Sequence, residues 1–302
     1  MEQIDELIDT KVLSPVLDEK LDSKEKGGKA PEKKADTTRK WDKFQLLKNI
    51  GTNTFYTLVG FAILFGVGEL IHFFSKGEFP SPINTLKVLW GLLKDPFYDN
   101  GPNDKGIGIQ LWSSLVRVFL GYGLGTIVAI PLGFLIGANV FFKKLFYPIV
   151  QILRPVSPLA WFPLGLATTH SVQSATIFII FITCLWPTLI NTAFGVGSVP
   201  EDHKNVGKAF GFSRWKYLTK ILLPFSLPHI ITGMRLSLGI AWMVIVAGEM
   251  LSGSMGLGFF VWDSWNSLSL ERVISAILII GFVGLLFDRI FNIIEKKVSY
   301  GN

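Results

Sequence analysis

PEDHKNVGKAFGFSRWKYLTKILLP, residues 200–224, is the longest polar stretch between the strongly apolar segments in the second half of the chain. Pro200 followed by two acids predicts a helix start, because proline loses no useful donor there and acids stabilise the positive end of a helix. Gly211 ends that helix, and Ser213 can cap a second one that breaks before Pro224. The stretch is thus predicted to form two short helices joined at a glycine corner.

One face of the first of these helices suits a docking surface. Val206 and Phe210 lie four residues apart on it, with Gly207 and Gly211 four apart beside them. Apolar side chains next to bare backbone fit a surface that a partner grips. An ordinary loop between two membrane helices is the simpler interpretation of the stretch taken alone, so the rest of the chain has to decide.

The composition is that of a membrane protein. Of the 302 residues 49% are apolar and 17% are charged, and the mean hydropathy is +0.43. The net charge of +6 does not predict nucleic-acid binding, because no basic-aromatic repeat or zinc-ligand spacing accompanies it. The single cysteine, Cys184, excludes an internal disulfide and a cysteine metal cluster. The polar start of the chain predicts no cleavable signal peptide.

Six long segments have almost no charged residues, and each can cross a hydrocarbon layer of roughly 30 Å at about 1.5 Å rise per residue. They are residues 49–74, 111–142, 145–167, 172–196, 227–251 and 272–294. The sequence therefore predicts an all-α membrane protein with six transmembrane helices. Four prolines between residues 148 and 163 should bend or break the third span, which is then expected to line a cavity because carbonyls freed inside lipid need partners.

Positive charge predicts the orientation of these spans. Residues 20–48 hold ten Lys or Arg against five Asp or Glu, and residues 201–220 hold five against two. By the positive-inside rule these segments and both termini are expected to be cytoplasmic in a multi-pass membrane protein. Residues 1–48 have too few apolar side chains to offset the entropy of ordering, so they are expected to be a mostly disordered tail.

The sequence contains no motif of an enzyme active site. It has no G-x-x-x-x-G-K-[ST], no H-E-x-x-H and no G-x-S-x-G, and no cluster of His, Cys and carboxylates at metal-ligand spacing. The chain is therefore expected to catalyse nothing and to bind no metal or cofactor. If it carries out active transport, the energy enters through a partner.

Charged and aromatic residues inside the spans are the candidate pathway residues. Arg154 heads the proline-rich segment and could meet a small anion in its cavity; a cation that pairs helices near the inner face is the alternative. Trp161 and Phe162 lie between two prolines, away from the membrane interfaces where aromatic residues usually gather.

For two more charged residues, both in the fifth span, the sequence allows two roles. Glu249 is the only acid in that span and could gate the outer mouth or hydrogen-bond a neighbouring helix. Arg235 could line the pathway, but pairing between helices is the simpler role for it, as it is for Arg117 in the second span.

Several stretches carry a family resemblance: SLVRVFLGYGLGTIVAIPLGFLIG (114–137), LRPVSPLAWFPLGL (153–166), GMRLSLGIAWMVIVAGEM (233–250) and the GLG of residues 256–258. Together, over about residues 79–297, the chain resembles the permease subunit of an ATP-binding-cassette (ABC) importer of the nitrate, sulfonate, taurine and bicarbonate group. DPFYDNGPNDKGIG (95–108) is similar to the outer loop of the cyanobacterial nitrate and bicarbonate permeases, with nitrate preferred of the two.

The opening stretch resembles the cytoplasmic coupling motif of that family, which is written EAA, three residues, Gly, then about nine residues to I-x-L-P. Gly211 matches the glycine and Pro224 the final proline. The EAA positions fall on Asn205, Val206 and Gly207, so the acid is missing. The resemblance therefore implies docking to an ATPase that depends on shape, with Phe210 beside these residues, more than on a salt bridge.

The resemblance also implies an organisation and a set of partners. The fold would be that of a type I ABC importer permease, with a tail at 1–48, a first transmembrane helix and periplasmic loop at 49–110, a core at 111–297 holding the coupling helix at 200–213, and a C-terminal tail at 298–302. Two copies would form a homodimer in the bacterial inner membrane with two cytoplasmic ATPase subunits, which carry the ATP and Mg, and a periplasmic anion-binding protein. The chain would select and gate, and would bind no nucleic acid.

The expected cargo is a small inorganic anion, nitrate or nitrite first, with bicarbonate, cyanate, sulfonates and taurine as alternatives. A secondary carrier driven by protons or sodium is a hypothesis of another class, and it predicts inverted repeats and a carboxylate buried at mid-membrane. No repeat is visible in the sequence, and Glu249 is the one serious candidate acid. Dependence of vesicle uptake on ATP separates the two hypotheses.

Overall fold

The computed structural model describes residues 37–102 and 104–299, and the fold of these residues is all-helical, as predicted. Their one element of strand pairing is an isolated antiparallel bridge between Asp99 and Lys105. The chain divides after Val67 into two units, which are described separately. Among the described residues five helices are long and apolar enough to cross a membrane, and a bent pair makes a sixth span if it is counted as one.

The described part of the first unit belongs to α2 (Thr37–Phe74), which continues into the second unit. Its segment Phe55–Phe74 has the length and hydropathy of a membrane span. The helix begins at Thr37, inside the stretch that the sequence predicts to be a disordered tail. The rest of that predicted tail, residues 1–36, lies outside the described residues.

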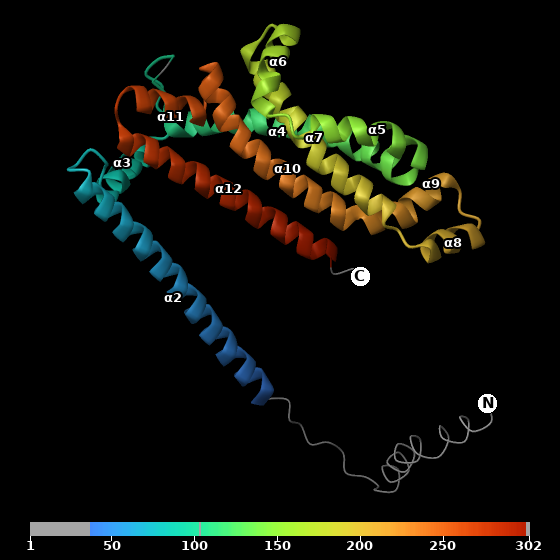
Figure 1. Ribbon diagram of the computed structural model, residues 1–302. Coiled ribbons are helices and arrows are strands. Elements are labelled where there is room, and N and C mark those ends of the chain that lie inside the picture. The colour runs from blue at the N-terminus through green and yellow to red at the C-terminus, as the bar shows by residue number, and fades with distance from the viewer. Residues whose placement is uncertain (1–36, 103, 300–302) are drawn as a thin grey trace, which may run out of the picture. The chain divides into compact units, whose positions relative to one another are not determined.

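The second unit holds the remaining helices. They are α3 (Pro82–Lys94), α4 (Ile107–Ala138), α5 (Val140–Leu153), the 3-10 turn η1 (Pro158–Trp161), α6 (Phe162–Thr169), α7 (Val172–Gly197), α8 (Glu201–Ala209), α9 (Arg214–Tyr217), the π-helical turn η2 (Leu218–Leu222), α10 (Leu223–Ser252), α11 (Leu257–Asn266) and α12 (Leu270–Ser299). Helix α7 packs between α4 and α10, and α12 lies along α10 (Figure 1).

Small residues set the close approach of α4 to α7. A Cβ added to Gly121 would lie 2.7 Å from the Cβ of Ile180, and one added to Gly137 would lie 2.5 Å from the carbonyl oxygen of Ala193. Neither position has room for a side chain, because backbone or a branched carbon occupies the space. Gly121 and Gly137 are thus packing residues, whereas Gly123 of the same span has nothing within 4 Å of an added Cβ.

The third predicted span is broken, as its prolines indicate. Helix α5 and the η1–α6 piece meet at an angle of 98° across residues 154–157. The preceding boundary differs from the prediction, because the second span was expected to run on to Phe142. Instead Asn139 is extended and its side chain accepts a hydrogen bond from Phe141 N, which caps α5 and ends α4 at Ala138.

The expected break before Pro224 is wrong. The chain runs from α9 through η2 directly into α10, with Pro224 in the first turn of α10. A proline ring collides with the carbonyl four residues earlier in a regular α-helix. The wider turn, in which Leu223 N donates to Leu218 O, removes that conflict and keeps the helix continuous.

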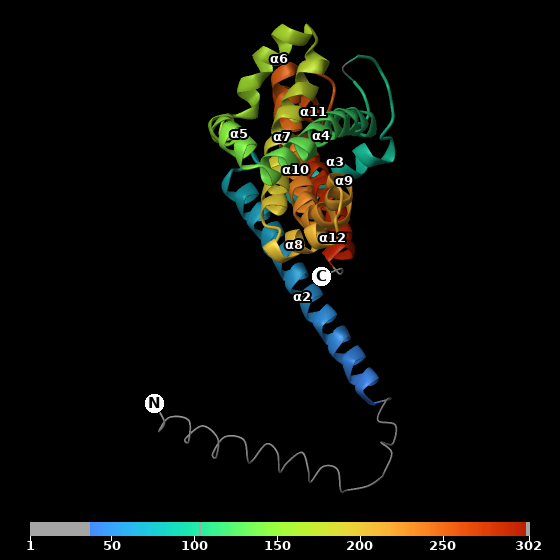
Figure 2. The ribbon, with the colours of Figure 1, turned by 90° about the vertical axis from the view of Figure 1, so that its right-hand side faces the viewer.

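The second unit has two distinct ends. Helices α8 and α9 lie at the same end as the C-terminal end of α12, whereas α11 lies toward the opposite end (Figures 1 and 2). The end with α8 and α9 carries the basic residues Lys208, Lys216, Lys296 and Lys297. The basic residues thus gather at the end with α8 and α9.

Candidate transport pathway and coupling region

Residues 200–217, here called the α8–α9 segment, form two short helices at a glycine corner, as predicted. Helix α8 carries Glu201 and Asp202 in its first turn. Gly211 has φ of +62°, the left-handed conformation that glycine adopts at low cost. Ser213 caps α9 by accepting a hydrogen bond from Lys216 N at 3.3 Å.

The outer face of the α8–α9 segment is apolar although the surroundings are polar. The side chains of Val206 and Phe210 are 49% and 73% exposed, and Trp215 is 74% exposed. Asn205 is exposed beside them. Large apolar side chains grouped at a polar end of a molecule indicate a contact surface. Trp215 was not among the predicted site residues, although an aromatic residue in a basic, polar stretch is a usable signal.

Gly207 faces the other way. It is buried, and a Cβ added to it would lie 2.9 Å from Cδ2 of Tyr217 and 3.2 Å from Cδ1 of Ile221. The glycine therefore lets α8 rest directly on the side chains of α9 and η2. Gly207 therefore lies on the buried face of α8 and not on the exposed one. A docking role for Gly207 and for the neighbouring residues stays a prediction.

Arg154 borders a cavity of about 350 Å³ between the α5–η1 break, α7 and α10. The other lining residues are Pro155, Val156, Ser157, Pro158, Ile182, Thr183, Trp186, Pro187, Ile190, Asn191, Leu236 and Ile240. Among the described side chains no carboxylate lies within ion-pair distance of Arg154. Arg154 is exposed, and a cation beside the cavity without a carboxylate partner can attract an anion.

Trp161 and Phe162 do not line that cavity. Phe162 is buried in the main hydrophobic core, and Trp161 packs against the same core. The indole Nε1 of Trp161 is buried without a hydrogen-bond partner among the described residues. These two residues brace the broken span, and a role in the pathway remains a prediction.

Arg235 connects two helices. Its Nε donates to Asp288 at 3.2 Å and its Nη1 donates to Glu295 at 3.1 Å, so the guanidinium of α10 pairs with two carboxylates of α12. It also borders a separate cavity between these two helices. The structure does not bring Arg235 to the cavity of Arg154.

Glu249 is fully buried at a junction of three helices. Its carboxylate accepts hydrogen bonds from Arg117 Nη1 at 2.8 Å and from Ser114 Oγ at 2.8 Å, both of α4. It also accepts one from Gly258 N at 2.9 Å. Arg117 completes the link by donating to Met255 O at 2.6 Å. These contacts bind α10 to α4 and to the start of α11, and a gating role for Glu249 stays a prediction.

Close contacts at this junction explain why both Gly256 and Gly258 are glycines. A Cβ on Gly256 would collide with the carboxylate of Glu249, and one on Gly258 would collide with Val246 O. Ser114 Oγ accepts from Leu257 N at 2.9 Å, so side chains of two other helices satisfy the first amide groups of α11. Ser114 was missed in the sequence because nothing local to it signals a distant helix start.

The chain is similar to known transport proteins over most of its length. The family model described as "Binding-protein-dependent transport system inner membrane component" matches residues 129–300. The nitrate import permease protein NrtB of Synechocystis sp. is 42% identical over 240 residues, which cover 80% of this chain and 87% of that protein. The bicarbonate transport system permease protein CmpB of the same organism is 44% identical over 223 residues, 74% of this chain and 80% of that protein.

A solved structure shows the same fold at low identity. The inward-facing MetNI methionine ABC transporter matches with a TM-score of 0.57 at 16% sequence identity, over 62% of this chain and 93% of that one. The match supports the arrangement of helices and nothing about the cargo. The chain belongs to the family of binding-protein-dependent transport system inner membrane components, the non-catalytic, membrane-spanning permease subunits of ABC importers.

Proposed function

We propose that this protein is the permease of an ATP-driven importer of a small inorganic anion, and that nitrate is the anion. The observation that carries the proposal is the cavity of Arg154, a cation without an acidic partner among the described side chains. Relatives named for nitrate and for bicarbonate share about two fifths of the sequence over most of the chain. Nitrate and bicarbonate are both anions, and either suits the positive charge of Arg154.

The lining of the cavity offers hydrogen-bonding groups that suit either anion. Arg154 donates to oxygens, and the Asn191 Oδ1 and the hydroxyls of Ser157 and Thr183 can accept the O–H of bicarbonate. Nitrate is put first because the relative named for nitrate matches 80% of this chain, whereas the relative named for bicarbonate from the same organism matches 74%.

Coupling to ATP hydrolysis would enter through the α8–α9 segment. Val206, Phe210 and Trp215 form the surface that a cleft of an ATPase subunit would hold. Because α8 rests on Tyr217 and Ile221, a push on α8 reaches η2 and then α10. Helix α10 borders the cavity of Arg154, so ATP-driven closure of the ATPases would change the cavity through a continuous set of contacts.

The proposed assembly is a homodimer of this chain with two cytoplasmic ATPase subunits and a periplasmic anion-binding protein. ATP and Mg would be held by the ATPase subunits and not by this chain. The basic end with α8, α9 and the end of α12 would face the cytoplasm together with both termini, as the positive-inside rule requires.

The test compares anions in the reconstituted transporter. With the binding protein present, nitrate should raise the rate of ATP hydrolysis several-fold, and equal concentrations of bicarbonate or taurine should raise it less. A larger stimulation by bicarbonate would transfer the assignment to that anion. Uptake that ignores ATP and follows a proton or sodium gradient would replace the importer with a secondary carrier.

A further inference from the structure

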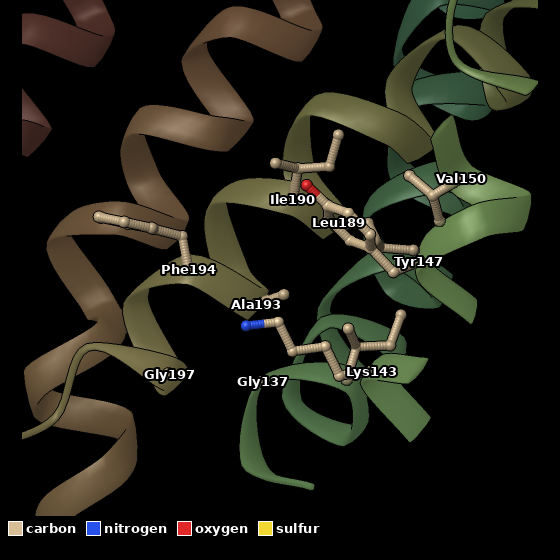
Figure 3. A pocket seen from close by; sticks show the side chains of 10 residues that line it. Gly137, Lys143, Tyr147, Val150, Leu189, Ile190, Ala193, Phe194 and Gly197 are labelled. Carbon is tan, nitrogen blue, oxygen red and sulfur yellow. The ribbon is translucent and has the colours of Figure 1, made fainter. Parts of the chain in front are cut away.

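A second cavity continues the seam between α5 and α7. It measures about 260 Å³ and is lined by Ile136, Gly137, Lys143, Tyr147, Val150, Leu189, Ile190, Ala193, Phe194 and Gly197 (Figure 3). Ile190 also lines the cavity of Arg154, so the two cavities meet at one side chain. Helices α5 and α7 run in opposite directions here, because the start of α5 lies beside the end of α7.

Three hydrogen-bond donors lie along this seam: Lys143 and Tyr147 of α5, and Arg154, the residue that caps the C-terminal end of α5. Lys143, Tyr147 and Arg154 are spaced at i, i+4 and i+11, which places them within an arc of about 40° on one helix face. In Figure 3 the ammonium group of Lys143 points across toward α7 near Ala193, and the hydroxyl of Tyr147 points toward Ile190. The hydroxyl of Tyr147 thus lies along the seam between Lys143 and Arg154.

Nothing in the described seam competes for these donors. Neither cavity has an Asp or Glu in its lining. No carboxylate among the described side chains lies within ion-pair distance of Lys143. Lys143 and Arg154 are eleven positions apart in the sequence, which at 1.5 Å per residue corresponds to roughly 16 Å, about half of a hydrocarbon layer of roughly 30 Å.

We propose that the cavity of Lys143 is a second binding site for the transported anion, on the inward side of Arg154. This inference rests on the proposed function and extends it. The anion leaves Arg154, passes Ile190 beside the Tyr147 hydroxyl, and is held at Lys143 before release. The ligand is a small monovalent oxyanion or halide, because the site offers a single full charge. Its lining includes the small residues Gly137, Ala193 and Gly197.

The placement of the two cavities favours an anion over a phospholipid headgroup, because both lie along α5 and α7 and share Ile190 in their linings. A lipid bound at Lys143 would explain the cation and the apolar lining, but it would give no reason for a second cavity that ends at Arg154. Lys144 supplies a matched control. It is the neighbouring lysine, exposed as Lys143 is, and it does not line the cavity.

The functional test measures inhibition by anion on the ATP side. Proteoliposomes holding the complete transporter are loaded with ATP and increasing nitrate, and initial uptake of labelled nitrate is followed with the binding protein outside. Lys143→Gln should raise the internal nitrate concentration for half-inhibition about tenfold, the effect of losing one hydrogen bond to a charged group. Lys144→Gln should leave it unchanged, and Tyr147→Phe should raise it several-fold.

A binding test does not depend on transport. Iodide soaked into crystals of the complete transporter should give an anomalous peak at Lys143 in the wild type and in Lys144→Gln, and none in Lys143→Gln. Equal half-inhibition in all variants, an equal shift in both lysine variants, or no iodide peak would overturn the second site. A phospholipid found there by native mass spectrometry and lost in Lys143→Gln would overturn it as well. Failure of the wild type to import nitrate contradicts the proposed function instead, and the iodide result then decides the site alone.

Discussion

Replacing Glu249 by Gln should destabilise the protein strongly, because it leaves the Arg117 guanidinium buried without its counter-charge. Arg117 is 6% exposed and Glu249 is fully buried. Breaking a buried ion pair by removing one partner costs about 3–5 kcal/mol. For a unit of this size each kcal/mol lowers the melting temperature by about 2–4 °C, so the expected loss is on the order of 10 °C.

The double variant Arg117→Leu, Glu249→Gln separates charge from packing. The new amide oxygen at position 249 can still accept hydrogen bonds from Ser114 and Gly258, and no charge is left unpaired. Most of the lost stability should therefore return. The control is Asp288→Asn, whose exposed pair with Arg235 should contribute less than about 1 kcal/mol.

Melting of the detergent-solubilised protein, followed by size-exclusion chromatography after heating, measures all three variants. The reasoning predicts a large loss for Glu249→Gln, a partial recovery in the double variant and almost no change for Asp288→Asn. A Glu249→Gln protein as stable as the wild type would refute a structural ion pair at this junction. A double variant less stable than the single one would refute the argument from unpaired charge.

The remaining predictions concern three glycines and the loop that holds Asp99 and Lys105. Gly211→Val forces a branched side chain to φ of +62°, so the spans should fold while association with the ATPase subunits is lost; normal ATP-driven uptake would contradict the coupling role. Gly256→Ala should lower the melting temperature, since its Cβ would collide with the Glu249 carboxylate, whereas Gly239→Ala, with nothing within 4 Å, should not; equal melting of both would contradict this contact. The hydrogen bond from Lys105 lowers the pKa of Asp99, so the loop is stabilised above the ordinary pKa of an aspartate and loses that stability as pH falls through the lowered value. Amide exchange of Gly106, corrected for the intrinsic effect of pH, should speed up there in the wild type and not in Lys105→Ala; identical profiles would count against it.

The sequence predicted the fold well because its signals are local. Long uncharged segments require helices in lipid, and the prolines near Arg154 required a break, which the 98° bend confirms. The glycine corner at Gly211 followed from helix-stop chemistry in the same way. The continuous helix through Pro224 was not predicted, because a π turn depends on hydrogen bonds that no residue pattern announces.

Contacts between residues that lie far apart in the chain could not be predicted from the sequence. Glu249 and Arg117 stood out as charges inside spans, but their pairing joins positions 132 residues apart in the chain. The inward turn of Gly207 depends on where Tyr217 lies, which the spacing of apolar residues in α8 does not reveal. The spacing of Lys143, Tyr147 and Arg154 places them on one helix face, but no spacing reveals the two cavities that they border.

The most direct test of the central claim is ATP-driven uptake of labelled nitrate by the reconstituted transporter with Arg154→Gln. The account predicts that the variant assembles with its ATPase subunits as the wild type does, while nitrate uptake falls at least about tenfold. Wild-type uptake by Arg154→Gln would contradict the claim that the anion passes this cation. Equal loss of uptake and of assembly would show that the arginine supports the fold instead.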